Sequence, residues 1–247
     1  MKIIPLSEGT FTVDKSKKFI PFTKGVDNLQ DRPVGSLLVE IQPFCIVTQK
    51  DVLLIDTGLG FATASGKMQL HENLLQNGIE PSSVTKVLMS HLHKDHSGGI
   101  TTKHIESEKT TLSFPTATYY VHDKELFQHL DSLSGDYDED EVNLLKSSEN
   151  IVLYNEKGVI DDYIYFELTG GHSPHHCVFW IKEDGETVFF GGDVAPQLQQ
   201  MKSRFVAKYD YDGKKCMELR QEWWQKGHAE NWTFLFYHDI KHPVVKA

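Results

Sequence analysis

The sequence has few cysteines and no paired cysteine motif. Its three cysteines, Cys45, Cys177 and Cys216, are odd in number and far apart, and no C-x-x-C occurs among the 247 residues. A disulfide framework and a thiolate zinc site are therefore not expected. The three thiols are predicted to be reduced and structural.

Long apolar runs and an excess of basic charge are also missing. No apolar run reaches the length of about 18 residues that suggests a membrane span, and Pro5, Glu8 and Asp14 interrupt the N-terminal segment. We therefore expect no signal peptide, no membrane partner and a cytoplasmic protein. With 25 Lys and Arg against 35 Asp and Glu, the formal net charge is −10. Nucleic acid is not an expected partner, because its phosphates require neutralising cations.

What remains is the composition of a globular protein. Hydrophobic residues make up 39% of the chain and charged residues 24%, which is typical of folded rather than disordered proteins. No low-complexity segment, short repeat or linker divides the sequence. Residues 1–247 are therefore predicted to form one α/β domain that buries a substantial core.

Short apolar runs that end in polar residues recur along the chain and are interpreted as strands. Strands are expected at 2–14, 36–48, 51–58, 84–89, 119–121, 163–168, 188–190 and 234–237. Helices are predicted over 70–78 and 123–133. Segment 20–33 is expected to be a surface loop, the acidic run 135–141 a solvated connection, and 144–157 either a helix or a strand.

The most informative stretch is His91-Leu-His93-Lys-Asp95-His96, which follows the apolar run 84–89 and precedes two glycines. Imidazole and carboxylate are good ligands for a borderline metal such as zinc. A loop that leaves the end of a strand can aim such closely spaced side chains at common points, and the glycines permit a tight turn. The alternative interpretation is a histidine-rich surface loop in a chain with 13 histidines.

Three remote candidate ligands favour the metal hypothesis, because each follows a separate apolar strand. Side chains at strand ends of α/β folds converge on a common crevice. The predicted ligands are His91, His93 and His172 for one metal ion, Asp95, His96 and His238 for a second, and Asp193 as a bridge. We expect two divalent ions per chain, with zinc first and iron or manganese also compatible with imidazole and carboxylate ligands.

The order of these motifs resembles the metallo-β-lactamase superfamily. H-x-H-x-D-H is followed by G-H-S-P at 171–174, by G-G-D at 191–193, and by the late His238 after an apolar strand. The resemblance implies a four-layer αβ/βα sandwich, in which two mixed sheets pack face to face with helices outside. It also implies a dinuclear hydrolase in which a metal-bridging hydroxide attacks the substrate, with Asp95 as a proton relay to the leaving group.

Within the superfamily, segments 169–176, 192–196 and 231–239 resemble the branch of N-acyl-homoserine lactonases and methyl parathion hydrolase. His175 is a departure, because the family usually has glycine there, and a φ above zero would strain histidine. We expect His175 to have a packing role only, whereas His176 either packs or supports a metal ligand. Pro196 is a second departure, because some lactonases place a tyrosine there to assist the leaving group.

The leading hypothesis for the substrate is a lactone, such as an N-acyl-homoserine lactone, which would make the protein a quorum-quenching enzyme. A phosphotriester or aryl ester is the second choice, and a homodimer is compatible with either. An iron-binding redox protein or a non-catalytic metal-binding protein is the alternative class. The aromatic residues Phe22, Trp223, Trp224 and Trp232 are candidates for a substrate pocket, although core packing is the commoner role of such side chains.

Overall fold

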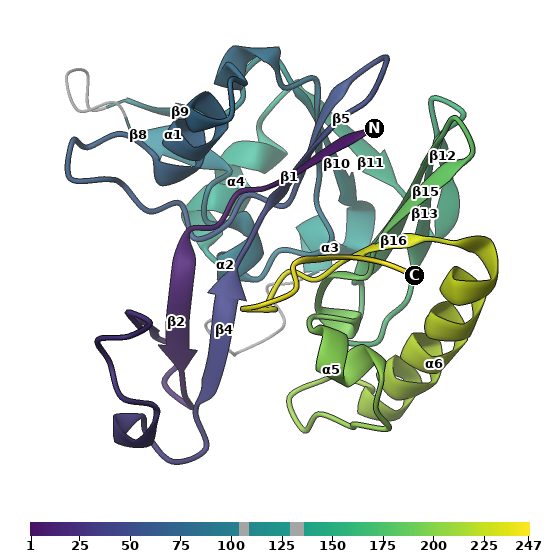
Figure 1. Ribbon diagram of the computed structural model, residues 1–247. Coiled ribbons are helices and arrows are strands. Elements are labelled where there is room, and N and C mark those ends of the chain that lie inside the picture. Colours follow the sequence, from purple (N-terminus) through teal and green to yellow (C-terminus); the bar gives the residue numbers. More distant parts are fainter. Residues whose placement is uncertain (104–108, 129–135) are drawn as a thin grey trace.

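Two six-stranded sheets form the centre of the protein (Figure 1). The computed structural model describes residues 1–103, 109–128 and 136–247. The strands of the first sheet are, in spatial order, β1 (Lys2–Pro5), β5 (Phe44–Val47), β6 (Val52–Ile55), β7 (Lys86–Leu88), β10 (Thr118–His122) and β11 (Ile151–Tyr154). Those of the second sheet are β12 (Lys157–Ile160), β13 (Ile164–Leu168), β14 (Cys177–Glu183), β15 (Glu186–Phe190), β16 (Thr233–Leu235) and β17 (Val244–Lys246).

Two smaller sheets and several helices surround this centre. The small sheets consist of β3 (Phe19–Pro21), β2 (Gly9–Val13) and β4 (Leu37–Ile41), and of β8 (Thr101–Lys103) and β9 (Thr110–Leu112). The α-helices are α1 (Gln69–Gln76), α2 (Lys94–Ser97), α3 (Asp123–Gln128), α4 (Glu139–Lys146), α5 (Leu198–Met201) and α6 (Gly213–Glu230). Short 3-10 turns lie at η1 (Leu29–Asp31), η2 (Pro81–Ser83) and η4 (Gly192–Val194). Among the described residues, no helix combines the length and the apolar character needed to cross a bilayer.

Alternation along the strands divides the core into layers. On β6, the side chains of Leu53 and Ile55 point into the core between the two sheets, whereas Leu54 points to the opposite face. Because successive side chains of a strand face opposite sides, one buried strand serves two cores. The rings of Phe44 and Phe190 meet between the sheets with their centroids 6.0 Å apart.

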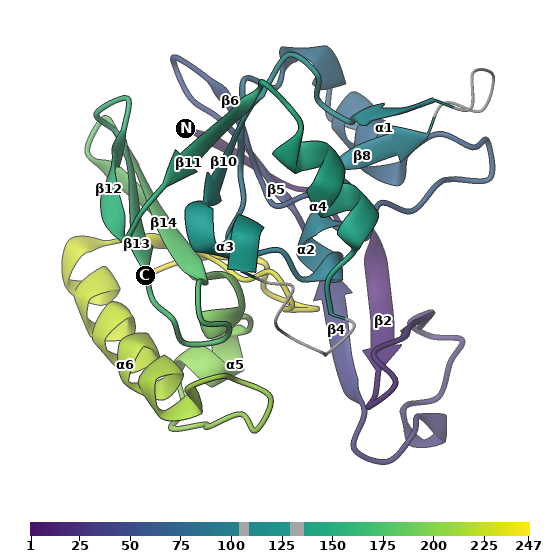
Figure 2. The ribbon, with the colours of Figure 1, turned by 180° about the vertical axis from the view of Figure 1, so that it is seen from behind.

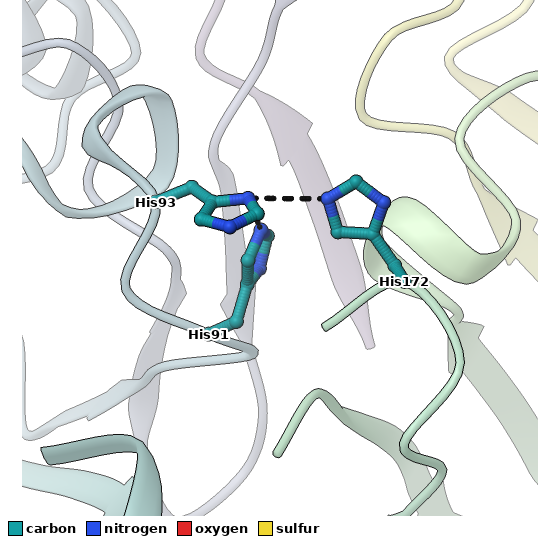
Figure 3. Close-up of side chains that lie close together, drawn as sticks. All are labelled: His91, His93 and His172. Carbon is teal, nitrogen blue, oxygen red and sulfur yellow. Dashed lines mark hydrogen bonds between the residues drawn. The ribbon is translucent and has the colours of Figure 1, made fainter. Parts of the chain in front are cut away.

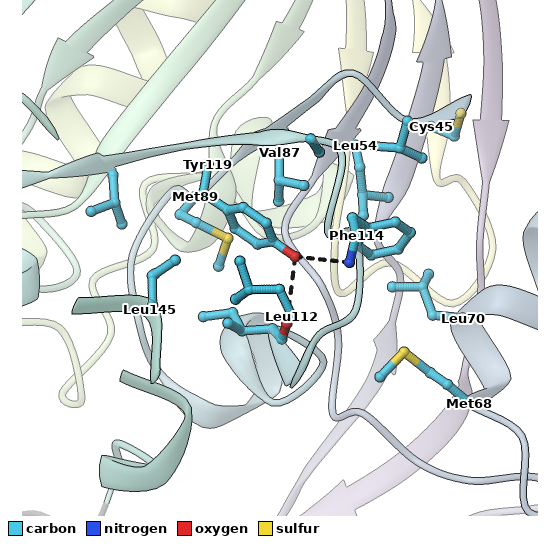
Figure 4. Close-up of a cluster of buried hydrophobic side chains, with 14 of the residues drawn as sticks. Cys45, Leu54, Met68, Leu70, Val87, Met89, Leu112, Phe114, Tyr119 and Leu145 are labelled. Carbon is cyan, nitrogen blue, oxygen red and sulfur yellow. Dashed lines mark hydrogen bonds between the residues drawn. The ribbon is translucent and has the colours of Figure 1, made fainter. Parts of the chain in front are cut away.

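Helices cover the outer face of each sheet (Figures 1 and 2). Leu54 on the first sheet belongs to the cluster that includes Leu70 of α1 and Leu145 of α4 (Figure 4). Phe189 on the second sheet packs against Trp223 of α6, with ring centroids 4.9 Å apart. The layers are therefore helix, sheet, sheet, helix, which confirms the predicted αβ/βα sandwich of two mixed sheets.

The candidate ligands follow strands that run in the same direction. β6 and β7 are parallel neighbours, so Asp56 and His91 follow them at one edge of the first sheet. β15 and β16 are also parallel, so Asp193 and His238 follow them at one edge of the second sheet. A 3.0 Å hydrogen bond from the His238 N–H to the Pro196 carbonyl joins the two loops of the second sheet.

One predicted connection is wrong in part. The acidic run 135–141 was expected to be a solvated connection, and residues 138–140 are exposed, but α4 begins within the run, at Glu139. The Asp138 carboxylate caps this helix by accepting hydrogen bonds from the N–H groups of Asp140 and Glu141, at 3.1 and 3.4 Å. Acidic side chains in the first turn also interact favourably with the helix dipole, so the run is a helix start.

The two predicted helices agree with the structure. The helix predicted over 70–78 corresponds to α1, and 144–157 contains both the end of α4 and strand β11. The helix predicted over 123–133 is confirmed as α3, and the remainder of that prediction falls on 129–135, outside the described residues. The 18-residue helix α6, at 213–230, was not predicted.

Candidate metal centre

The H-x-H-x-D-H segment changes from an extended loop to a helical turn. His91 lies in the loop after β7, His93 is the N-cap residue of α2, and Asp95 and His96 lie within that helix. The Ser97 hydroxyl fixes the turn by donating a 3.0 Å hydrogen bond to the His93 carbonyl. The change of backbone conformation lets the first two histidines and the last two side chains of the segment join different groups of ligand atoms.

A glycine lets this turn approach the loop that follows β6. A Cβ atom at Gly99 would lie 2.2 Å from the Thr57 carbonyl oxygen, so a larger residue would push the two loops apart. Thr57 in turn donates from its N–H and its hydroxyl to the His96 carbonyl, at 2.7 and 3.0 Å. This contact brings Asp56 beside the His96 imidazole, where the two side chains meet at 2.7 Å.

The first predicted group of ligands is assembled from both halves of the chain (Figure 3). His93 Nδ1 lies 3.0 Å from His91 Nε2 and 3.1 Å from His172 Nε2. His91 and His93 follow the first sheet, and His172 comes from the loop between β13 and β14 of the second sheet. One ligand atom from each residue lies within 4.8 Å of the others, which is close enough for one metal ion to contact all three.

The second predicted group lies beside the first and shares a carboxylate with it. Asp95 Oδ2 lies 3.5 Å from His238 Nε2 and 3.9 Å from His96 Nε2. Asp193 Oδ1 lies 3.1 Å from both of these imidazole nitrogens, and its Oδ2 lies 3.3 Å from His172 Nε2. The two oxygens of Asp193 thus face different groups, as the predicted bridge requires. One ligand atom from each of His91, His96 and Asp193 also lies within 4.8 Å of the others. These three residues therefore connect the first group with the second.

The donor atoms fit divalent metal ions. A zinc ion with bonds of about 2.0–2.2 Å to tetrahedral N and O ligands holds neighbouring ligand atoms roughly 3.3 Å apart, and most separations here are 3.0–3.5 Å. His96 Nε2 and Asp193 Oδ1 are buried and have no hydrogen-bond partner among the described residues. Buried polar atoms normally find partners, so these two atoms are available to coordinate an ion.

Three oxygen atoms outside the cluster orient the imidazoles. His96 Nδ1 donates to Asp56 Oδ2 at 2.7 Å, and His172 Nδ1 donates to Asp210 Oδ1 at 2.9 Å. His238 Nδ1 donates to the backbone oxygen of Glu40 at 2.8 Å. A proton held on Nδ1 leaves the Nε2 lone pair free for a metal, and such contacts fix the ring and raise its basicity.

The sequence comparison agrees with this geometry. The family described as the Metallo-beta-lactamase superfamily matches residues 40–224. The chain belongs to this superfamily. A comparison with curated protein sequences gives no match.

Solved structures of similar shape include hydrolases and lactonases. A probable metal-dependent hydrolase from Staphylococcus aureus superimposes with a TM-score of 0.76 at 20% identity, covering 99% of this chain and 91% of that one. The hydrolase AbOPH gives 0.72 at 22% identity, with 99% and 89% covered. AidC, a dizinc quorum-quenching lactonase solved with its product N-hexanoyl-L-homoserine, gives 0.71 at 18% identity, with 98% and 88% covered.

These findings confirm the expected class of enzyme, a metal-dependent hydrolase. At identities of 18–22% the structural likeness supports the fold and leaves the substrate open. The structure brings all seven predicted ligands together, and their roles at bound metal ions stay predictions.

Burial keeps some of the histidines in this metallo-β-lactamase site neutral. It lowers the pKa of His91 and of His93 well below the ordinary range, and neighbouring imidazoles add to the effect. Neutral imidazole is the form that binds a metal. These two side chains are therefore ready to accept an ion without first losing a proton.

Charge pairing has the opposite effect around Asp193. Burial opposes the charged forms, but the nearby imidazoles of His238, His96 and His172 outweigh it and lower the pKa of the Asp193 carboxyl well below its usual value. Burial likewise opposes a charge on His96, but Asp193, Asp95 and Asp56 outweigh it and raise its pKa. In the metal-free protein, protonated imidazoles such as that of His96 thus supply the positive charge beside the Asp193 carboxylate. Metal binding is expected to release their protons.

A cavity of 570 Å³ opens over the cluster. Asp95, His172, Asp193 and His238 are among the residues that line it. The apolar part of its lining comes from the three-stranded N-terminal sheet and consists of Val13, Phe19, Leu37, Leu38 and Val39. The aromatic residues suggested as a pocket lie elsewhere, because Trp223 and Trp232 are buried in the core between α6 and the second sheet, and neither Phe22 nor Trp224 lines the cavity.

The two histidines after Pro174 have different surroundings. The ring of His175 stacks on that of His122 at 5.5 Å, and its φ is not positive, so the strain considered from the sequence does not arise. His176 is buried, and its Nε2 accepts a 3.1 Å hydrogen bond from the N–H of Asp193. His175 therefore packs as predicted, and His176 supports a candidate ligand.

Sequence reasoning missed the residues that orient the ligands. Asp56 was not among the predicted site residues, and neither Glu40 nor Asp210 was assigned a role. The available signal was the position of Asp56 directly after a buried strand, which is the same position that identified Asp193 and His238.

Proposed function

We propose that the chain hydrolyses the ring ester of a lactone, with an N-acyl-homoserine lactone as the first candidate. The observation that carries this proposal is the Asp193 carboxylate, which lines the cavity and whose two oxygens face two groups of ligands. Such an arrangement suits a hydrolase that places a carbonyl group between two cations. Zinc is the first candidate for both ions.

The seven side chains would hold the ions, and their surroundings prepare them to do so. Two divalent ions bound here would supply a nucleophile derived from water near neutral pH and would polarise the carbonyl group. The protein keeps His91 and His93 neutral by burial. Asp56 and Asp210 hold the rings of His96 and His172 with Nε2 toward the centre.

Asp95 is suited to a second task, the transfer of a proton to the leaving group. It lines the cavity, and its Oδ2 lies 3.5 Å from His238 Nε2. A carboxyl group at this place can accept a proton from the attacking water and give it to the departing alkoxide, which is general acid–base catalysis.

The shape and chemistry of the cavity support an acylated lactone. Candidate ligands line the cavity, and Val13, Leu38 and Val39 contribute apolar side chains to the same lining. An apolar acyl chain would bury its surface against this wall while the ring ester reaches the ligands. AidC binds a product of this type and has a similar fold.

One observation favours a second candidate, an aryl ester or phosphotriester. Pro196 lines the cavity, and its side chain has no group that could donate a proton to a leaving oxygen. A substrate that releases a stabilised phenoxide would need no such donor.

A panel of substrates tests both candidates. The zinc-loaded protein should hydrolyse an N-acyl-homoserine lactone faster, by kcat/KM, than a nitrophenyl ester or a phosphotriester. Asp193→Ala should lose this activity, whereas Glu149→Ala, a change of an exposed acid outside the cavity, should retain it. Full zinc content with no hydrolysis of any lactone would contradict the first candidate.

A further inference from the structure

A chain of polar side chains lies on the cavity wall beside the candidate ligands. Gln197, Gln200 and Tyr209 all line the cavity. Gln197 Nε2 donates to the His238 carbonyl at 3.1 Å, and Gln200 Nε2 donates to Gln197 Oε1 at 3.4 Å. The Gln200 amide also hydrogen-bonds the Tyr209 hydroxyl. The phenol is thereby linked through two amides to the backbone of a candidate ligand.

The backbone around Tyr209 is attached to the loop that carries His172. Asp210 accepts the 2.9 Å hydrogen bond from His172 Nδ1, and the Tyr211 N–H donates to the His172 carbonyl at 3.0 Å. The Tyr209 ring meets the His172 ring edge-on, with centroids 6.2 Å apart. The Tyr209 ring is therefore held next to the first group of ligands.

The Tyr209 hydroxyl can donate its proton to a bound molecule. A tyrosine hydroxyl has one proton to donate and can also accept. The Tyr209 side chain is 47% exposed, so its hydroxyl can contact both the Gln200 amide and the solvent in the cavity. A substrate bound in the cavity can replace this solvent as the acceptor of the phenolic proton.

We propose that Tyr209 is a catalytic residue that donates a hydrogen bond to the carbonyl oxygen of the substrate as negative charge develops there. The proton stays on the phenol throughout, so Tyr209 stabilises charge and forms no covalent bond. This role rests on the proposed hydrolysis of a lactone or ester. It complements the proposed role of Asp95, which serves the leaving oxygen.

The variant Tyr209→Phe removes the donor and keeps the ring. Removing one donor of this kind costs about 10²–10³ in kcat. We expect a loss of about that size for both a lactone and a nitrophenyl ester, with little change in KM, because both substrates have the same carbonyl group. Tyr211→Phe is the matched control, since this tyrosine is two residues away, exposed and outside the cavity lining. It should retain the wild-type kcat.

A binding measurement separates this role from a structural one. A phosphonate analogue of the tetrahedral intermediate carries the developing charge, whereas the ring-opened hydroxy acid does not mimic it. Calorimetry should show at least tenfold weaker phosphonate binding by Tyr209→Phe and a nearly unchanged affinity for the hydroxy acid, at unchanged metal content. Unchanged kcat and unchanged phosphonate affinity would overturn the role of Tyr209. If the wild type hydrolysed neither substrate, the proposed function would fail instead. The phosphonate affinities of the wild type and of Tyr209→Phe would still show whether Tyr209 donates a hydrogen bond to the developing charge.

Discussion

Single residues beneath the cluster decide how its imidazoles are aimed. The Asp56 side chain is fully buried, has a φ of +56° and accepts from the Ser90 N–H, the Ser90 hydroxyl and His96 Nδ1, all at 2.7 Å. A buried carboxylate in the left-handed region is strained and desolvated, so the folded protein must compensate for it elsewhere. Such costs are typical of functional sites, and Asp56 faces a candidate ligand.

Asp56→Asn should therefore weaken metal binding without removing a ligand. Loss of a partner that orients a ligating histidine typically costs about 10–100-fold in metal affinity. We expect a decrease of this size for one of the two ions, measured by competition with a chromogenic chelator. The exposed control Glu149→Ala should bind both ions as the wild type does. An unaltered affinity in Asp56→Asn would show that the contact with His96 does not tune the metal.

Asp95 is expected to affect substrates according to their leaving groups. An aliphatic alkoxide from a lactone needs a proton, whereas a nitrophenoxide leaves without one. General acid assistance is worth about 10²–10⁴ in rate, so Asp95→Asn should lose lactone hydrolysis by far more than nitrophenyl ester hydrolysis. Steady-state kinetics on both substrates measures this difference. Metal content must be equal to that of the wild type, and equal losses on both substrates would then restrict Asp95 to the role of a ligand.

At the scale of elements, the sequence predicts strands and their ends better than helices. Apolar runs such as 84–89 predicted several of the strands, although β14 at Cys177–Glu183 was not predicted. The polar residues after the predicted strands included all seven members of the cluster. Helix α6 was missed because its buried positions are Cys216, Arg220, Trp223 and Gly227. Their spacing is helical, but an arginine and a glycine interrupt the apolar pattern. Arg220 is buried because it donates to the Val194 and Phe205 carbonyls, which no local pattern indicates.

Helix α3 holds the ligand loop through one buried acid. The Glu125 carboxylate accepts from the Leu92 N–H at 2.9 Å and from the Tyr137 hydroxyl at 3.2 Å, and burial raises its pKa from the ordinary value of 4.5 to about 7. The folded state thus keeps a proton that the unfolded chain loses at lower pH. Its contribution to stability is full below pH 4.5 and is lost as the pH rises through about 7.

Glu125→Gln should remove this pH dependence while it keeps an acceptor for Leu92. The free energy of unfolding of the variant, relative to the wild type, should rise between pH 5 and pH 8 by up to roughly 3 kcal/mol, from about 1.4 kcal/mol per pKa unit. Urea unfolding of the metal-free proteins across this range measures it. Glu149→Gln, an exposed change, should follow the wild type. Parallel curves for wild type and Glu125→Gln would contradict the raised pKa.

At the scale of the whole molecule, the candidate centre joins the two halves of the sandwich. His91, His93, Asp95 and His96 follow the first sheet, whereas the other three side chains come from loops of the second. The sequence indicated this convergence, because strand ends meet at a common edge. It could not indicate the contacts of His172 with Asp210 or of His238 with the Glu40 carbonyl, since these arise only when distant segments pack together.

The central claim is that two metal ions are held by two groups of ligands that share Asp193. The most direct test counts metal ions by elemental analysis after zinc reconstitution and dialysis of the wild type, His172→Ala and His238→Ala, together with their lactone hydrolysis. The account predicts two ions per chain in the wild type, one in each variant, and loss of activity in both. A single ion in the wild type, or either variant with two ions and undiminished activity, would contradict it.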